Sequence, residues 1–272
     1  MQLTARSARS LIPPVTEQPY EPLSPPDDTA LAPSEPPRRR RVARAIARGL
    51  FEWAKSVSLA ILLFLVVRSF LVEAFKIPTG SMEGTLLVGD FLLVNKLVYG
   101  ADVPYTGRRL PAISMPKYRD IVVFQYPVDP GVNFVKRLVG LPGDTLAMEN
   151  GALIRNGQRE VEPYVTHSDP GGDPAGEDFG WQRGFLVRHV GASPSYHPSR
   201  NNWGPIVVPL RQYFMLGDNR DNSLDSRYWG FVADTLVRGR PLLVYYSYAP
   251  DSTHAFDWLT RVRWQRFGER VR

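Results

Sequence analysis

The sequence contains no cysteine. Thiol catalysis, cysteine-ligated metal sites and disulfide bridges are therefore excluded, and the chain is compatible with any redox compartment. Histidine is scarce, and the four residues present are His167, His189, His197 and His254. None lies in a recognisable Ser–His–Asp context, so we interpret all four as surface or structural residues.

Long apolar runs are nearly absent as well. The hydrophobic content of 43% is ordinary for a globular protein, and only one segment is strongly apolar. Its uncharged run, residues 56–67, would form a helix of about 18 Å, shorter than a hydrocarbon core of about 30 Å. That length suits a buried helix or a cleavable signal, but no small-x-small cleavage site follows it. Because Lys55 and Arg68 can extend to lipid headgroups, we predict one transmembrane helix over residues 50–75.

The first 49 residues are rich in proline and arginine. Residues 1–37 contain nine prolines and few apolar side chains, a composition that cannot offset the entropy of ordering the chain. Six arginines from Arg38 to Arg48 then supply much of the net charge of +6. A nucleic-acid-binding arm would need interleaved aromatic residues, whereas arginine-rich flanks remain on the cytoplasmic side of a membrane. We therefore predict a disordered cytoplasmic tail over residues 1–49.

After residue 76 the pattern changes to short β-rich runs separated by Gly, Pro, Asp or Asn. These runs are residues 86–88, 91–94, 121–124, 134–135, 206–208, 213–216 and 242–246. Residues 262–267 alternate like an edge strand, although their aromatic and basic side chains could also rest on lipid headgroups. We predict a mostly β domain over residues 76–272, with a loop-rich inserted subdomain at about residues 150–210.

Two residues in this domain could support acyl transfer. Pro78 and Gly80 bracket a tight turn that leaves Ser81 beside free backbone N–H groups, although a Gly-Ser pair is by itself more often an ordinary turn. Lys136 lies in an apolar strand, where burial could lower its pKa from about 10.4 toward 7–8 and make it a base. From periodicity alone, a Lys136 that reaches solvent from an edge strand is the more frequent case.

Three segments together resemble the signature boxes of bacterial type I signal peptidase. They are residues 78–82, 135–144 and 217–230, and the resemblance extends over about residues 50–272. It implies a membrane-anchored all-β catalytic domain with Ser81 as the nucleophile and Lys136 as the general base. It also implies that Thr79 helps to hold the oxyanion and that Ser223 hydrogen-bonds Lys136.

The same resemblance implies further roles around this pair. Asp225 and Arg227 would form a supporting ion pair, and the substrate-binding residues would be Ile77, Pro78, Met82 and Val135. The enzyme would cut signal peptides from exported preproteins at Ala-X-Ala-like sites, without a metal or cofactor. It would lie in the inner (plasma) membrane as a single-pass protein, with a cytoplasmic N-terminus, an extracytoplasmic catalytic domain, lipid as a partner and no nucleic acid.

Two further motif matches in the sequence fail. Ser114-Met115-Pro116-Lys117 fits the S-x-x-K pattern, but Pro116 would break the required helix and no K-T-G follows. The acidic segment from residue 221 has Ser226 where a calcium loop needs glycine. Two alternatives remain at this point: a self-cleaving repressor-type Ser–Lys protease, and a non-catalytic membrane-tethered β domain.

Overall fold

The structure is a computed structural model that describes residues 38–103, 106–169, 172–173, 177–187, 196–251 and 256–272. The described residues divide into two units between Ser56 and Val57. The disordered tail predicted for residues 1–37 lies outside the described residues.

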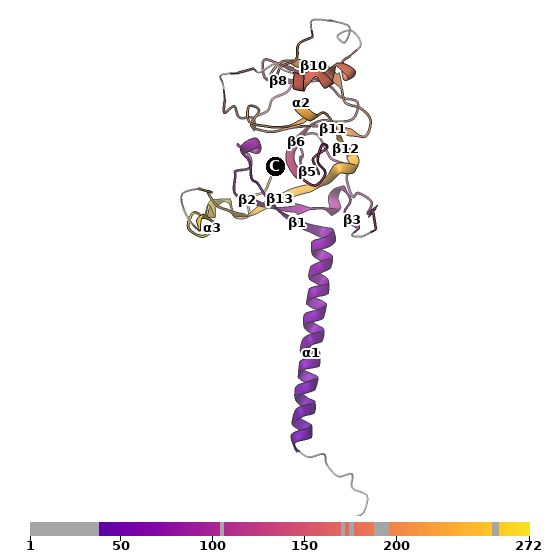
Figure 1. Cartoon of the computed structure of the whole chain (residues 1–272), viewed down its shortest axis with the longest axis vertical. Helices are drawn as coiled ribbons and strands as arrows, with labels where there is room; N and C mark the ends of the chain where they lie inside the picture. The colour runs from indigo at the N-terminus through magenta and orange to yellow at the C-terminus, as the bar shows by residue number, and fades with distance from the viewer. Residues whose placement is uncertain (1–37, 104–105, 170–171, 174–176, 188–195, 252–255) are drawn as a thin grey trace, which may run out of the picture. The chain divides into compact units, whose positions relative to one another are not determined.

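One long helix dominates the first described part of the chain. Helix α1 (Arg38–Val66) continues into a π-helical turn, η2 (Val67–Leu71), and strand β1 (Val72–Lys76) follows (Figure 1). Residues 42–71 are long and apolar enough to cross a membrane, about 45 Å as a helix, and their most apolar stretch is unburied. The prediction of one N-terminal apolar helix is confirmed.

The predicted helix bounds are wrong at both ends. Residues 38–49 are helical rather than disordered, because arginine, alanine and leucine are good helix formers and lead directly into the apolar run. At the other end, residues 72–75 form a strand because β1 pairs in an antiparallel ladder with β2 (Asp90–Asn95). Tertiary pairing therefore sets where the helix ends.

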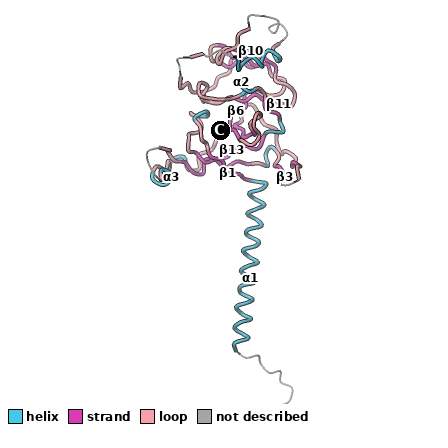
Figure 2. Tube along the Cα trace, in the orientation of Figure 1, coloured by secondary structure: helices cyan, strands magenta, loops and turns pink. Residues whose placement is uncertain are grey.

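A seven-stranded antiparallel sheet is the largest sheet among the described residues of the second unit, in the order β1-β2-β13-β5-β6-β11-β12. Figure 2 shows strands (magenta) and loops (pink) as the main components of this part. The remaining strands of the sheet are β5 (Ile121–Gln125), β6 (Asn133–Gly140), β11 (Gln212–Leu216), β12 (Val232–Ala233) and β13 (Val237–Ser247). The prediction of a mostly β fold is confirmed.

A second sheet of four strands has the order β10-β7-β8-β9. Its strands are β7 (Thr145–Glu149), β8 (Ala152–Arg155), β9 (Gln158–Arg159) and β10 (Trp203–Val207), and β3 (Asp102–Val103) pairs separately with β4 (Arg108–Arg109). The short helices are α2 (Ser226–Trp229), α3 (Asp257–Thr260), η3 (Gly80–Met82), η4 (Leu97–Tyr99), η5 (Glu177–Phe185), η6 (Asp234–Leu236) and η7 (Trp264–Arg266).

Two of the predicted strands are wrong. Residues 86–88 form a turn, since the amides of Thr85 and Leu86 both donate to the carbonyl oxygen of Met82 and curl the chain. Residues 262–267 contain η7 instead of an edge strand, because Arg266 turns inward and binds the Asp90 carboxylate with two hydrogen bonds of 3.0 and 2.8 Å. In both places a specific local contact overrides the alternation of the sequence.

The core cluster beneath the Ser81 loop joins segments that are distant in sequence. Its buried members are Ile77, Met82, Leu86, Leu92, Val94, Ile121, Val123, Val244 and Val271. Met82 is 1% exposed, so the residue directly after Ser81 anchors this loop in the core. Burial of such a side chain contributes about 1.5–3 kcal/mol, which fixes the loop on the sheet.

Candidate active site

Ser81 lies in the 3₁₀ turn η3, between the end of β1 and the core residue Met82. Thr79 is extended before the turn, and the amide of Glu83 donates to the carbonyl oxygen of Gly80 at 3.0 Å to close it. The carbonyl oxygen of Ser81 accepts a hydrogen bond of 3.2 Å from the amide of Asn219. The motif at residues 78–82 is therefore joined to the motif at residues 217–230 by a backbone hydrogen bond.

Lys136 lies on β6, opposite Val122 of β5, and is 4% exposed. Its Nζ is 2.5 Å from Ser81 Oγ, within hydrogen-bonding distance. Burial lowers the pKa of Lys136 from 10.5 to about 8; the charges of Asp225 and Asp218 raise it, and that of Arg227 lowers it. Among the described residues no carboxylate lies within ion-pair distance of this amine, so the desolvation cost dominates.

A cavity of about 310 Å³ opens beside this pair, and we call it the Ser81 hollow. The structure brings every predicted substrate-binding residue to it, namely Ile77, Pro78, Met82 and Val135, together with Thr79. Sequence reasoning missed the other lining residues, which are Phe75, Lys76, Val132, Asn133, Phe134, Asn222 and Leu224. Most of its wall is apolar, so it can take up uncharged side chains next to Ser81.

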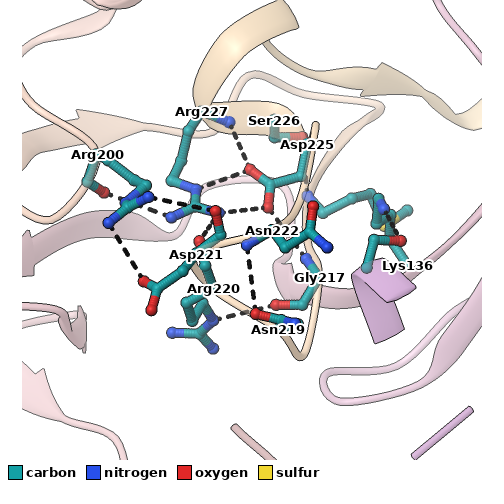
Figure 3. A network of polar contacts seen from close by, with 12 residues as sticks. Lys136, Arg200, Gly217, Asn219, Arg220, Asp221, Asn222, Asp225, Ser226 and Arg227 are labelled. Carbon is teal, nitrogen blue, oxygen red and sulfur yellow. Dashed lines mark hydrogen bonds and ion pairs between the residues drawn. The ribbon is translucent and has the colours of Figure 1, made fainter. Parts of the chain in front are cut away.

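Asp225 and Arg227 form the predicted ion pair, and both side chains are 0% exposed. Two hydrogen bonds of 2.8 Å join the guanidinium to the two carboxylate oxygens (Figure 3). Burial by itself would raise the pKa of Asp225, but the charge and hydrogen bonds of Arg227 bring it below its ordinary value. Asp225 also accepts a hydrogen bond of 3.1 Å from the amide of Gly217, which ties the pair to the strand end beside Ser81.

The prediction that Ser223 hydrogen-bonds Lys136 is wrong for this structure. Among the described residues, the buried Ser223 hydroxyl has no hydrogen-bond partner. It packs against Gly217 instead: a Cβ at Gly217 would lie 2.2 Å from Ser223 Oγ and 2.4 Å from the carbonyl oxygen of Ser81. Glycine is therefore required at position 217 for the three segments to approach each other.

A second buried ion pair was missed by sequence reasoning. Arg137 and Asp218 are 3% and 1% exposed and are joined by hydrogen bonds of 2.8 and 2.7 Å. Thr85 Oγ1 donates a further hydrogen bond of 2.6 Å to Asp218. One signal was available: two adjacent cations, Lys136 and Arg137, in an apolar strand require a counterion for at least one of them.

Thr79 lies close to Ser81, whereas the described histidines form no hydrogen bond with Ser81. Thr79 Oγ1 is 3.4 Å from Ser81 Oγ, on the rim of the Ser81 hollow. His167 is half exposed and contacts Asp221 at 3.2 Å, and His197 is exposed. His189 and His254 lie outside the described residues. Of the basic side chains that the structure describes, Lys136 is the one hydrogen-bonded to Ser81.

Ser114 and Lys117 lie in a stretch without helix, and the Ser114 hydroxyl donates to the carbonyl oxygen of Met115. That arrangement agrees with the exclusion of this S-x-x-K match.

Comparison with known proteins decides the family. A family model described as "Signal peptidase, peptidase S26" matches residues 50–246. The chain belongs to the signal peptidase family. A signal peptidase I from Pseudomonas aeruginosa is 41% identical over 217 residues, which is 74% of each chain, and one from Pseudomonas fluorescens is 39% identical over 210 residues, or 73% of each.

Among solved structures, a signal peptidase I from Enterococcus faecalis is 29% identical and matches 47% of this chain and 98% of that one. Its TM-score of 0.32 is too low to compare the two folds. Membership of the signal peptidase family confirms the predicted resemblance and the predicted activity of a serine endopeptidase that cleaves signal peptides. The repressor-type and non-catalytic alternatives are therefore not retained.

Proposed function

We propose that Ser81 is the nucleophile and Lys136 the general base of this signal peptidase. The observation that carries the proposal is the distance of 2.5 Å between Lys136 Nζ and Ser81 Oγ inside an apolar hollow. A neutral Lys136 accepts the Ser81 hydroxyl proton as Oγ attacks the scissile carbonyl carbon. The resulting ammonium gives that proton to the departing amine, and the regenerated base then deprotonates the water that hydrolyses the acyl-enzyme.

Negative charge on the carbonyl oxygen needs donors beside Ser81. We assign this role to the backbone N–H of Ser81 and the hydroxyl of Thr79, whose Oγ1 lies 3.4 Å from Ser81 Oγ. Donors that are already oriented before the reaction stabilise the tetrahedral intermediate without reorganisation cost. Asp225 and Arg227 hold the third motif in place, and through Gly217 and Asn219 they fix the Ser81 loop.

The Ser81 hollow supports recognition of small residues before the scissile bond. Ile77, Pro78, Met82 and Val135 line it, so an Ala-X-Ala-like sequence would place its methyl groups against apolar walls. Larger or charged side chains would have to displace these walls or be desolvated. The volume of about 310 Å³ suits two or three small side chains.

We further propose that residues 42–71 cross the plasma membrane once, with the arginine-rich start of α1 in the cytoplasm and the β domain outside. Substrates arrive with their signal peptides still in the bilayer, so anchoring raises their effective concentration near Ser81. Protease protection of inverted and right-side-out vesicles tests this orientation, because an outside β domain is digested only in right-side-out vesicles.

Cleavage of a purified preprotein by the full chain tests the catalytic proposal. Ser81→Ala and Lys136→Ala should each lower kcat/KM by at least about 10³-fold. For the wild-type chain, kcat/KM should rise with pH and level off above pH 8, because burial lowers the Lys136 pKa to about 8. Normal cleavage by either variant would remove that residue from the mechanism.

A further inference from the structure

A second hollow, of about 450 Å³, lies away from Ser81 and shares no lining residue with the Ser81 hollow. We call it the basic hollow and define it by Arg240, Arg270 and Arg272, with the apolar residues Val98, Leu242 and Leu243. It combines three positive residues with an apolar lining. Neither the motifs nor the catalytic mechanism uses it.

Backbone pairing brings these arginines together. The segment after η7 returns along β13: the amide of Val244 donates to the carbonyl oxygen of Glu269 at 2.9 Å, and Leu243 is bridged to Arg270. Val271 is 8% exposed and packs in the core, which holds the arginine on each side of it at the rim. Like charges on neighbouring strands repel each other and destabilise the fold unless something compensates them.

Compensation within the protein is small. Arg240 contacts Asp120 at 3.4 Å, and Asp120 also accepts hydrogen bonds from the Tyr99 hydroxyl and the Lys117 amide. Within the described part of the chain, no acidic residue forms an ion pair with Arg270 or Arg272. The side chains that line the basic hollow therefore carry excess positive charge, and an anionic ligand would supply the counter-charge that these side chains lack.

The position of the basic hollow indicates which class of anion would lie near it. Asn95 lines it and is paired with Val72, the first residue after η2. The next amide, that of Lys96, donates to the carbonyl oxygen of Leu71 at 3.0 Å, and Leu71 is the last residue of the apolar span. The hollow is thus adjacent in the β1–β2 ladder to the point where the chain leaves the apolar span.

We propose that the basic hollow binds the phosphoryl headgroup of an anionic phospholipid. This inference rests on the membrane insertion proposed above. Guanidinium groups bind phosphate oxygens through paired hydrogen bonds, and Leu242, Leu243 and Val98 can contact the glycerol and first acyl carbons. Free phosphate would satisfy the arginines alone and would leave the apolar lining without a function.

The test uses the full chain in phosphatidylcholine vesicles that contain trace spin-labelled phosphatidylglycerol or spin-labelled phosphatidylcholine. The ratio of the two association constants reports headgroup preference. Arg240→Gln combined with Arg270→Gln should lower the phosphatidylglycerol preference by about fivefold or more. Arg240→Lys with Arg270→Lys should retain part of it, because the charge remains and the paired hydrogen bonds are lost.

A matched control is Arg108→Gln with Arg159→Gln, which removes two exposed arginines outside the basic hollow and should leave the preference unchanged. An equal loss in this control, or no loss in the Arg240/Arg270 variant, would overturn the proposal. Complete displacement of labelled phosphatidylglycerol by millimolar inorganic phosphate would show a small-anion site and would overturn the lipid assignment.

Vesicle flotation and preprotein cleavage in detergent separate this result from the proposed function. A folded, inserted and active Arg240/Arg270 variant attributes the lost preference to the hollow alone. Failure of wild-type chain to float with vesicles would instead refute membrane insertion, together with the lipid assignment that depends on it.

Discussion

Lys136 and Arg137 are adjacent on β6, and the regions they enter contrast with each other. Both side chains are almost fully buried, at 4% and 3% exposure. Lys136 enters the apolar Ser81 hollow and is hydrogen-bonded to Ser81. Arg137 instead binds the buried carboxylate of Asp218 through two hydrogen bonds. Equal burial therefore coexists with opposite electrostatic surroundings.

The contrast explains how one strand supplies both a base and a support. A buried cation costs several kcal/mol unless it is paired or loses its proton. Arg137 is paired and stays charged, as guanidinium does throughout the accessible pH range. For Lys136 the same desolvation lowers the pKa to about 8, so a useful fraction of the amine is neutral near physiological pH.

Lys136→Arg makes the two neighbouring residues identical and should have the largest effect on preprotein cleavage. The variant keeps a positive charge in the Ser81 hollow but cannot accept the Ser81 proton. We expect preprotein kcat/KM to fall by at least about 10³-fold at every pH from 6 to 10. Recovery of activity at high pH would show that a group other than Lys136 is the base.

Arg137→Met removes the cation of the Arg137–Asp218 ion pair and should have the next largest effect, on the stability of the fold. It leaves Asp218 buried without its partner, so the free energy of unfolding should fall by about 3–5 kcal/mol in urea titrations. Arg211→Met is the control, because the Arg211–Asp234 pair is largely exposed and should change stability little. Equal losses of unfolding free energy in the two variants would contradict a stabilising role of the buried Arg137–Asp218 pair.

Among the described residues that line the Ser81 hollow, Thr79 carries the one side-chain hydroxyl besides that of Ser81, and Thr79→Val tests its role. We expect kcat to fall by roughly 10²-fold with KM nearly unchanged, because the lost donor acts on the tetrahedral intermediate. Thr260→Val is the control, as its hydroxyl is exposed and bonds only the carbonyl oxygen of Phe256 among the described residues. A matching rise in KM would point to substrate binding instead.

Lys136→Met removes the base and should abolish cleavage, but its effect on the free energy of unfolding should be the smallest of the changes considered, and favourable. The Lys136 pKa falls from 10.5 in the unfolded chain to about 8 in the fold, so the unfolded state binds more protons between these values. Below pH 8 the full cost is present, and the variant should be about 1–3 kcal/mol more stable than wild type at pH 7. That advantage should disappear by about pH 10.5, as shown by urea titrations at several pH values. A constant advantage would deny the link to protonation.

Sequence patterns predicted the type of fold and the residues that the structure brings together around Ser81. Alternation and turn residues are local signals, and they located six of the seven β-rich runs after residue 76 in strands. They failed at residues 86–88 and 262–267, where hydrogen bonds to Met82 and Asp90 decide the local structure. Those contacts join distant segments or depend on one side chain, so no periodicity reveals them.

Within the site, the sequence predicted which residues take part more readily than which partners they bind. The resemblance of three segments to the family's signature boxes located Ser81, Lys136, Asp225 and Arg227, but the partner of Arg137 is 81 positions away in sequence. The Ser223 hydroxyl could not be assigned because its orientation depends on the close packing against Gly217. Such details depend on distances of a few tenths of an ångström, which a pattern of residue types does not carry.

The ladder between β1 and β2 has a consequence for where a preprotein is cut. The five residues of β1, about 17 Å of extended chain, follow Leu71, and residues 77–79 then lead to the turn that holds Ser81. The register of β1 with β2 prevents this segment from sliding. With the membrane insertion proposed above, β1 sets a fixed distance between the end of the apolar span and Ser81. We expect the scissile bond to be chosen by its height above the bilayer as well as by the side chains around it.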